Sequence, residues 1–414
     1  MNPARTASRP RLAALTALLA LTALVPTANG PATAATGPTG GDAPHRPCVA
    51  SKVPGRGPAR EVLRIAERAK AELDLTSVIL RVTDGGREVV TTALGESMTG
   101  VPADPAMHFR NGNIAISYMG AALLRLVDQG RVRLDDPVSR WLPELKDADR
   151  ITLRMLAAST TGLVDYVRLP AFQQAVVANP FRQWTARELV ALSTERERWY
   201  EPGTNWSYSH ANFVLLGAAL EKITGTRLDV LLRRQVLKPL GLSETRNSFT
   251  PEIPEPALHA YTADRGTYEE STFWNPSWTT APGAVETTDI CDLARSAAGI
   301  GSGELLSPAS YRELLDPGTV GLGHATEKCP ATVCLAQTER THYGFGVLVL
   351  GDWIAQHPLF FGYSASQAYL PSRGLAIAVS TTQGRGTPAG HTAHLIAQRI
   401  AAALEPGRPI PDFG

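Results

Sequence analysis

The spacing of apolar residues near the N-terminal end predicts one helix followed by a β-hairpin. Residues 59–73 place apolar side chains at helical spacing. Residues 77–83 and 88–95 are two runs rich in β-branched side chains, typical of strands. Asp84-Gly85-Gly86 lies between the two runs, and such a sequence favours a tight turn.

The middle of the chain has a mostly helical pattern with long loops. The clearest helices are expected at 113–129 and 211–224, and each is followed directly by a glycine, Gly130 and Gly225. Glycine is the usual residue just past the end of a helix because it adopts a left-handed conformation at low cost.

Strand character returns in the last quarter of the chain. Strands are expected at 343–350, 365–370 and 375–381, with a turn at 371–374 and a final helix at 391–404. Strands at both ends with helices between them predict an α/β or α+β fold. In this fold an antiparallel sheet is built from both termini and carries an inserted, mostly helical lobe.

The N-terminal segment has the features of an export signal. Arginines precede a 14-residue apolar run at 12–25, which is too short for a membrane span, and small residues follow. We expect a signal peptide at 1–34, a Gly/Pro/Ala-rich linker at 35–58 and one domain at 59–405, whose helical lobe covers about 105–300. The alternative for the leader is an uncleaved anchor. The sequence contains no apolar run of the ~18 residues that a spanning helix needs.

Composition excludes several classes of protein. Hydrophobic residues make up 43% of the 414 residues, enough for a large core, so a disordered chain is excluded. Without the first 34 residues, which hold three arginines and no acid, the 40 basic residues become 37 against 39 acidic ones, a net charge of −2. A general nucleic-acid binder carries a basic excess, so we expect no nucleic-acid partner.

The four cysteines all follow the predicted leader, and an even number in an exported protein predicts two disulfides. Cys329 and Cys334 flank four residues and are expected to close a small loop, which leaves Cys48 to pair with Cys291. No Cys-x-x-Cys or close Cys/His cluster is present, so we expect no metal and no cofactor.

Six segments in chain order carry a resemblance to a known family: 109–145, 149–166, 202–225, 237–245, 281–296 and 362–382. They resemble the serine DD-peptidase and class C β-lactamase family, above all its secreted DD-carboxypeptidases. The resemblance covers nearly the whole mature chain and implies a β-lactamase/transpeptidase-like fold.

The first catalytic motif of that family is missing both of its functional residues. The family uses Ser-x-x-Lys at the start of a buried helix, where the i, i+3 spacing puts the lysine amine beside the nucleophilic hydroxyl. In the corresponding stretch of this chain, Asn113 occupies the serine position and Ile116 the lysine position. An amide is not a nucleophile and an alkyl side chain cannot accept a proton.

The other two motifs are also altered. Tyr-x-Asn becomes Tyr208-Ser209-His210, so the tyrosine is retained and the asparagine is replaced. The His/Lys-Thr/Ser-Gly motif is expected near Gln356-His357-Pro358, where its glycine is absent and a proline removes a strand N–H. Loss of the nucleophile costs a serine hydrolase roughly 10⁴–10⁶ in rate. Ordinary acyl-enzyme chemistry is therefore not expected.

Each replaced residue has a structural and a functional interpretation. Asn113 is either an N-cap that bonds a free backbone N–H or a group that binds a ligand carbonyl. Ile116 is expected to fill the core, and Ser117 to be structural. The dipeptide Asp165-Tyr166 is interpreted as part of a loop that the family shares.

The candidate cleft has further polar and aromatic residues. Tyr208 and His210 are alternate residues of an extended segment, so they either face the cleft together as a proton-transfer pair or merely pack. His357 is a candidate third polar group. Trp274 and Trp278 are expected either to line the cleft rim or to pack in the core.

Three functional hypotheses follow. The first is a secreted pseudoenzyme that binds a small molecule, cell-wall peptide, glycan or protein partner in the former cleft. The second is a repurposed enzyme that runs non-covalent acid–base chemistry (isomerisation, cyclisation or hydrolysis) through Tyr208 and His210. The third is a residual serine hydrolase that uses another serine. A monomer is expected.

Overall fold

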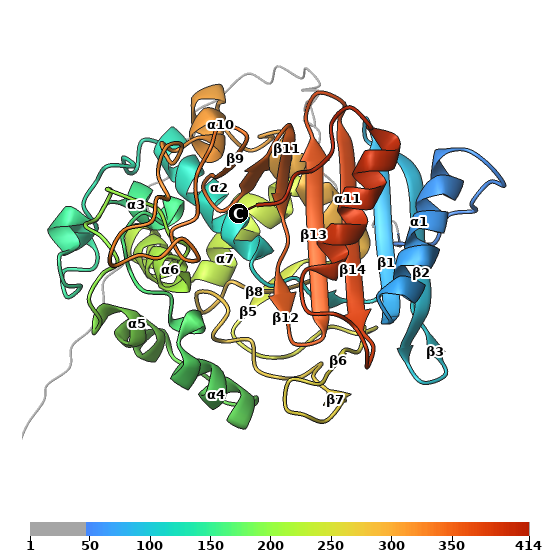
Figure 1. The fold of residues 1–414 in the computed structure, drawn as a ribbon. Coiled ribbons are helices and arrows are strands. Elements are labelled where there is room, and N and C mark those ends of the chain that lie inside the picture. The colour runs from blue at the N-terminus through green and yellow to red at the C-terminus, as the bar shows by residue number, and fades with distance from the viewer. Residues whose placement is uncertain (1–46, 414) are drawn as a thin grey trace, which may run out of the picture. The chain divides into compact units, whose positions relative to one another are not determined.

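An antiparallel sheet joins the two ends of the described chain, because β1 pairs with β14 at its centre (Figure 1). The structure, a computed structural model, describes residues 47–413. The sheet has nine strands, in the spatial order β3 (Val101–Pro102), β2 (Arg87–Met98), β1 (Leu75–Asp84), β14 (Leu375–Gln383), β13 (Tyr363–Leu370), β11 (Trp353–Gln356), β10 (Leu348–Leu350) and β9 (Thr341–Tyr343), with β12 (Leu359–Phe360) against β13.

Helices cover both faces of this sheet. The first and last helices, α1 (Pro58–Glu72) and α11 (Thr392–Leu404), lie side by side on one face and contact β1, β2, β13 and β14 (Figure 1). The other face packs against α9 (Ile290–Gly301). Each strand of the β13–β14 hairpin is therefore buried on both sides, which explains the continuous apolar run at the start of β14 and the small or neutral side chains along β13.

The remaining helices form the inserted part of the fold. Its centre is α2 (Ile114–Asp128), which contacts α6, α7, α9 and α10 and is buried around almost its whole circumference. The other helices and turns are η1 (Val138–Arg140), η2 (Ala148–Arg150), α3 (Leu153–Ala158), η3 (Tyr166–Arg168), α4 (Pro170–Ala178), α5 (Ala186–Thr194), α6 (His210–Thr224), α7 (Leu228–Leu232), η4 (Arg233–Leu237), α8 (Lys238–Leu240) and α10 (Pro308–Leu315).

Two small sheets complete the fold. The first has the order β4 (Phe109–Arg110), β8 (Val285–Thr288) and β5 (Arg246–Ser248), and the second pairs β6 (Tyr261–Thr262) with β7 (Glu269–Glu270). Strand β4 leads directly into the turn before α2, so the first small sheet fixes where α2 begins.

The expected architecture, an antiparallel sheet flanked by helices and formed from both ends of the chain, is confirmed. The predicted hairpins at 77–95 and 365–381 are present as β1–β2 and β13–β14. The single strand predicted at 343–350 is wrong. It is divided into β9 and β10, because Gly344 and Gly346 form the turn between them, and Gly346 has a φ of 74° that a strand does not allow.

Both predicted disulfides are present. Cys48 is bonded to Cys291 and Cys329 to Cys334. In the part of the predicted linker that the structure describes, Cys48 is buried and the Ser51 amide donates to the Thr91 carbonyl, so residues 48–51 are fixed along β2. The predicted signal peptide and residues 35–46 lie outside the described residues.

Two further findings concern the whole described chain. None of the helices in residues 47–413 is long and apolar enough to cross a membrane. Within the same residues, the group with metal-compatible spacing is Cys48, Asp289 and Cys291, and its two sulfur atoms are joined in the disulfide.

Candidate functional site

Asn113 lies at the N-cap position of α2 but does not use its side chain as a cap. Its Nδ2 donates to Tyr208 Oη at 3.0 Å and lies 3.3 Å from His210 Nε2, and it makes no capping bond. The predicted capping role is therefore wrong. Tyr208 and His210 offer acceptors, so the amide turns away from the helix and towards them.

The turn before Asn113 is held tightly by the segment after β11. Gly112 has a φ of 50°, and a Cβ placed there would lie 2.7 Å from Pro358 Cβ. A larger residue would have to push Pro358 away, so glycine is needed both for the conformation and for the close approach. This contact fixes the position of Asn113.

Ile116 is a buried core residue, as expected. It is fully buried, and a Cβ at Gly346 would lie 2.8 Å from Ile116 Cγ2 and 2.5 Å from its carbonyl oxygen. The place that corresponds to the family's lysine is thus filled by apolar contact. Ser117, the next residue, is buried and donates to the Ile114 carbonyl at 2.7 Å, so its hydroxyl is used within the helix.

Tyr208 lies beneath Asn113 in an aromatic environment. Its ring centroid is 5.0 Å from that of His210 and 5.9 Å from that of Tyr343. Burial raises the pKa of the Tyr208 phenol well above its ordinary value, and the nearby Tyr343 and Asp165 act in the same direction. Tyr208 is therefore a neutral phenol at neutral pH, able to donate one hydrogen bond and accept others.

His210 is the first residue of α6 and forms an ion-pair contact with Asp165. The His210 Nδ1 atom is 2.9 Å from Asp165 Oδ1, which also accepts the His210 backbone N–H at 3.2 Å. Asp165 is only 4% exposed, and the same oxygen accepts the Val167 N–H at 3.2 Å. One buried carboxylate thus orients the imidazole and caps the start of two helical segments.

The sequence interpretation missed Asp165. In the sequence, Asp165-Tyr166 has the character of a loop, and 45 residues separate Asp165 from His210, so no local spacing links the two. The carboxylate accepts from Nδ1–H, so Nε2 is the ring nitrogen on the side away from Asp165. That nitrogen points at the Asn113 amide. The result is a carboxylate–imidazole pair whose basic nitrogen lies beside an amide and a phenol.

The two tryptophans occupy different places. Trp274 is 1% exposed and packs on Phe361, so it belongs to the core and not to a rim. Trp278 is partly exposed and contacts Phe360 at a centroid distance of 5.9 Å. Its carbonyl accepts from Tyr166 Oη at 2.7 Å, which ties it to the loop that carries Asp165.

The structure does not place His357 with Tyr208 and His210. His357 Nδ1 is 3.2 Å from His391 Nδ1, and its ring centroid is 4.2 Å from that of His394. The prediction of a third polar group in the cleft is therefore wrong. In β11 the Gln356 side chain reaches the Gly346 carbonyl on the cleft side, so the next residue points to the opposite face, where α11 packs.

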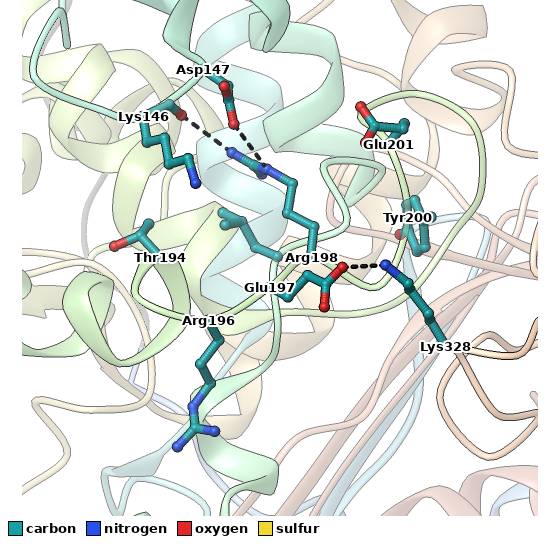
Figure 2. A pocket seen from close by; sticks show the side chains of 10 residues that line it. Lys146, Asp147, Thr194, Arg196, Glu197, Arg198, Tyr200, Glu201 and Lys328 are labelled. Carbon is teal, nitrogen blue, oxygen red and sulfur yellow. Dashed lines mark hydrogen bonds and ion pairs between the residues drawn. The ribbon is translucent and has the colours of Figure 1, made fainter.

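A separate hollow of about 310 Å³ (Figure 2) has Leu163, two residues before Asp165, in its lining. Each of its carboxylates is paired with a basic side chain, in the pairs Asp147–Arg198, Glu197–Lys328 and Glu201–Arg150. Neither Asn113, Tyr208 nor His210 lines this hollow, so it is distinct from the candidate site.

Comparison with known proteins finds similar chains that are named as peptidases, esterases and amidases. Among curated proteins, the chain is 30% identical over 201 residues to the D-alanyl-D-alanine-carboxypeptidase/endopeptidase AmpH of Escherichia coli K12, covering 46% of this chain and 49% of AmpH. It is 28% identical over 204 residues to Esterase EstB of Burkholderia gladioli, covering 46% and 51%. The chain thus spans about half the length of these relatives.

Among solved structures, the chain resembles a D-stereospecific amidohydrolase from Streptomyces sp., with a TM-score of 0.69, 24% identity and coverage of 84% and 99% of the two chains. It also resembles the D-amino acid amidase of Ochrobactrum anthropi SV3, with a TM-score of 0.70, 22% identity and the same coverage. At this identity the likeness concerns the fold. The sequence model of the beta-lactamase family matches residues 62–401, and the chain therefore belongs to the beta-lactamase family.

Proposed function

We propose that this protein is a pseudoenzyme of its family, one that binds a peptide-like ligand in the former active-site cleft without forming an acyl-enzyme. The observation that carries the proposal is the pair Asn113 and Ile116 at the serine and lysine positions. Asn113 is held by Tyr208, and Ile116 is sealed into the core. Neither can supply a nucleophile or the base that activates one.

The remaining polar groups favour a ligand with a carbonyl or carboxylate. The Asn113 amide and the Tyr208 phenol are donors that a carbonyl oxygen can accept from, and both side chains are partly exposed. AmpH is named for D-alanyl-D-alanine peptides, and the two similar structures are named for D-amino acid compounds. A peptide that ends in a D-amino acid is therefore the ligand class that we propose, with cell-wall glycan or a protein partner as the alternatives.

Titration calorimetry with an acyl-D-alanyl-D-alanine peptide tests this proposal, with the L,L-isomer as the matched ligand. We expect measurable binding of the D,D-peptide and a loss of at least about tenfold in Asn113→Leu, since a buried bond to a carbonyl contributes roughly 1–3 kcal/mol. Equal affinity for both isomers, or for the wild type and Asn113→Leu, would contradict binding through this site.

The contact between Asp165 and His210 favours a second candidate, a hydrolase that works without a covalent intermediate. Here His210 Nε2 takes a proton from a water molecule while the water oxygen bonds to a substrate amide carbon. The oxyanion accepts hydrogen bonds from Asn113 and Tyr208. The C–N bond then breaks, and the imidazolium returns its proton to the leaving amine. Asp165 stabilises the charged ring throughout.

A panel of D-amino acid amides and esters tests the second candidate. Removing a general base costs roughly 10²–10⁴ in rate, so His210→Ala should reduce any turnover by that factor, and Tyr208→Phe should reduce it less. Turnover that is unaffected by both changes would place the chemistry elsewhere. A fluorophosphonate adduct on a serine would instead support a residual serine hydrolase.

We also propose that the protein is exported and works as a monomer. The two disulfides suit an oxidising compartment, and none of the described helices is a membrane span. Mass spectrometry of protein from the culture medium should find an N-terminus near residue 35. Light scattering should give the mass of one chain, whereas retention in the membrane fraction or a larger mass would contradict the respective proposal.

A further inference from the structure

Three polar side chains form a buried row across the small sheet that precedes α2. Asn247 of β5 is the direct cross-strand partner of Glu286 in β8, and the Asn111 N–H donates to the Glu286 carbonyl at 3.2 Å. Directly opposite residues of an antiparallel pair point to the same face. The side chains of Asn111, Glu286 and Asn247 therefore lie next to each other, and Glu286 is 2% exposed.

This row has too few hydrogen-bond donors. Asn111 Nδ2 donates to Glu286 Oε1, and Asn247 Nδ2 donates to the Ala284 carbonyl at 3.3 Å. Glu286 Oε2, Asn247 Oδ1 and Asn111 Oδ1 have no partner with good hydrogen-bond geometry among the described residues, although the Asn247 and Tyr118 side chains lie close enough to interact with the Glu286 carboxyl. Turning the Asn247 amide over would set its oxygen against the Ala284 carbonyl oxygen, so a flip does not solve the shortage. A buried acceptor without a donor costs roughly 1–3 kcal/mol.

We propose that Glu286 is held as a neutral carboxylic acid, whose proton bonds to Asn247 Oδ1 and thereby positions the turn from Asn111 to Asn113. The proton turns Glu286 Oε2 from an acceptor into a donor, and Asn247 Oδ1 thereby gains the donor that it lacks. The proton ties β5 to β8, and β8 holds Asn111, which lies two residues before Asn113. Glu286 is thus a positioning residue for the candidate site, whichever ligand the site takes.

The surroundings of Glu286 favour the neutral form. Burial raises the pKa of the Glu286 carboxyl well above its ordinary value, Asp292 of α9 adds to this, and bonds from neighbouring side chains oppose it only in part. From α2 the neighbour is the Tyr118 phenol, which donates to Ser296 Oγ at 2.8 Å. Arg110 of β4 is directed elsewhere, to the Thr272 carbonyl at 3.0 Å.

The variant Glu286→Gln tests the proposal because its amide mimics the protonated acid. Glutamine donates to Asn247 and accepts from Asn111 at every pH. The pKa of Glu286 is higher in the folded state than in the unfolded state. The protonated carboxyl therefore stabilises the fold fully below the unfolded-state pKa of about 4.3, and this stabilisation is lost as pH rises towards the folded-state pKa. Relative to Glu286→Gln, the unfolding constant of the wild type should therefore rise about tenfold per pH unit in that window.

Two controls separate this effect from general changes. Glu252 is an exposed glutamate, and Glu252→Gln should show no such slope relative to the wild type. Infrared spectra at neutral pH should contain the C=O band of a protonated carboxyl that is absent in Glu286→Gln. The proposal would be overturned if this band were missing and the unfolding constant showed no such pH dependence. It would also be overturned if the wild type bound one equivalent of a metal cation that Glu286→Gln does not bind.

The positioning role has its own readout. The NMR signal of His210 Nε2 in protein labelled with ¹⁵N-histidine reports the contact with Asn113. This signal is identified by its absence in His210→Ala. As rising pH ionises Glu286, this signal should shift in the wild type and stay constant in Glu286→Gln. If both proteins show the same pH profile, Glu286 holds a proton without positioning the site.

Discussion

Replacing Asp165 should destabilise the protein more than any exposed carboxylate does, because one buried oxygen serves three donors. Asp165 Oδ1 accepts from the His210 side chain, the His210 backbone and the Val167 backbone, at 2.9, 3.2 and 3.2 Å. In Asp165→Ala all three donors lose their acceptor, in a site where Asp165 is 4% exposed.

The size of the effect follows from these contacts. A hydrogen bond to a charged group contributes roughly 1.5–3 kcal/mol, and a carboxylate at a helix start adds roughly 0.3–1 kcal/mol. Because bonds to one oxygen are not additive, we expect Asp165→Ala to lower the free energy of unfolding by about 3–5 kcal/mol. Asp165→Asn keeps an oxygen in the same place and loses only the charge, so its cost should be about 1–2 kcal/mol.

Urea unfolding at pH 7, followed by tryptophan fluorescence and extrapolated linearly, measures these differences. Asp149→Ala is the matched control, since Asp149 is exposed in the first turn of η2 and should cost less than ~0.5 kcal/mol. If Asp165→Ala were within 1 kcal/mol of the wild type, or if the asparagine variant lost as much as the alanine variant, the assigned role of the charged carboxylate would be refuted.

Three further predictions concern the scaffold. By the chain-entropy relation, removing the Cys48–Cys291 disulfide, which spans 243 residues, should lower the free energy of unfolding by about 5 kcal/mol. Removing the Cys329–Cys334 disulfide, which spans five residues, should lower it by about 2 kcal/mol. Urea unfolding of variants in which both cysteines of a bridge are replaced by serine compares the two. Ile116→Ala should lower stability by about 2–5 kcal/mol in the same assay, and a smaller loss would argue against tight packing at this position. Burial lowers the pKa of His394 to about 4, so the folded state should lose stability as pH falls from about 6.5 towards 4. In His394→Leu, the free energy of unfolding should change less with pH over this range. An unchanged pH dependence would contradict the role given to His394.

The elements with strong local signals could be predicted from the sequence. Gly130 and Gly225 mark the ends of α2 and α6, and both have the positive φ that such ends require. The strand patterns at the two ends of the chain predicted one sheet built from both, and the structure adds that β1 pairs with β14. Local propensity failed at 343–350, where apolar residues continue through a turn that Gly346 makes possible.

The site could be predicted only in part, because its contacts cross large sequence distances. Asn113, Tyr208 and His210 were found from the spacing of family motifs, and the structure brings their side chains together. Asp165 was missed since nothing in its neighbourhood distinguishes a functional aspartate from a loop residue. His357 was misplaced by one step of strand alternation, and such an error moves a side chain to the opposite face of a sheet.

Glu286 shows a different limit of sequence reasoning. Its strand neighbours Asn111 and Asn247 lie 175 and 39 residues away in the chain, and only the register of the small sheet brings the three together. A single acidic residue in a sequence carries no sign of burial. The shortage of donors around Glu286 is a property of the folded arrangement alone.

The central claim is that this cleft forms no acyl-enzyme, and labelling with a fluorescent penicillin tests it most directly. The folded protein is incubated with the probe beside an active serine DD-carboxypeptidase, then denatured and analysed by gel fluorescence and intact mass. The positions of Asn113 and Ile116 predict an unchanged mass and no fluorescence for this protein, while the active enzyme is labelled. A covalent adduct that survives denaturation and maps to a serine of the cleft would contradict the account.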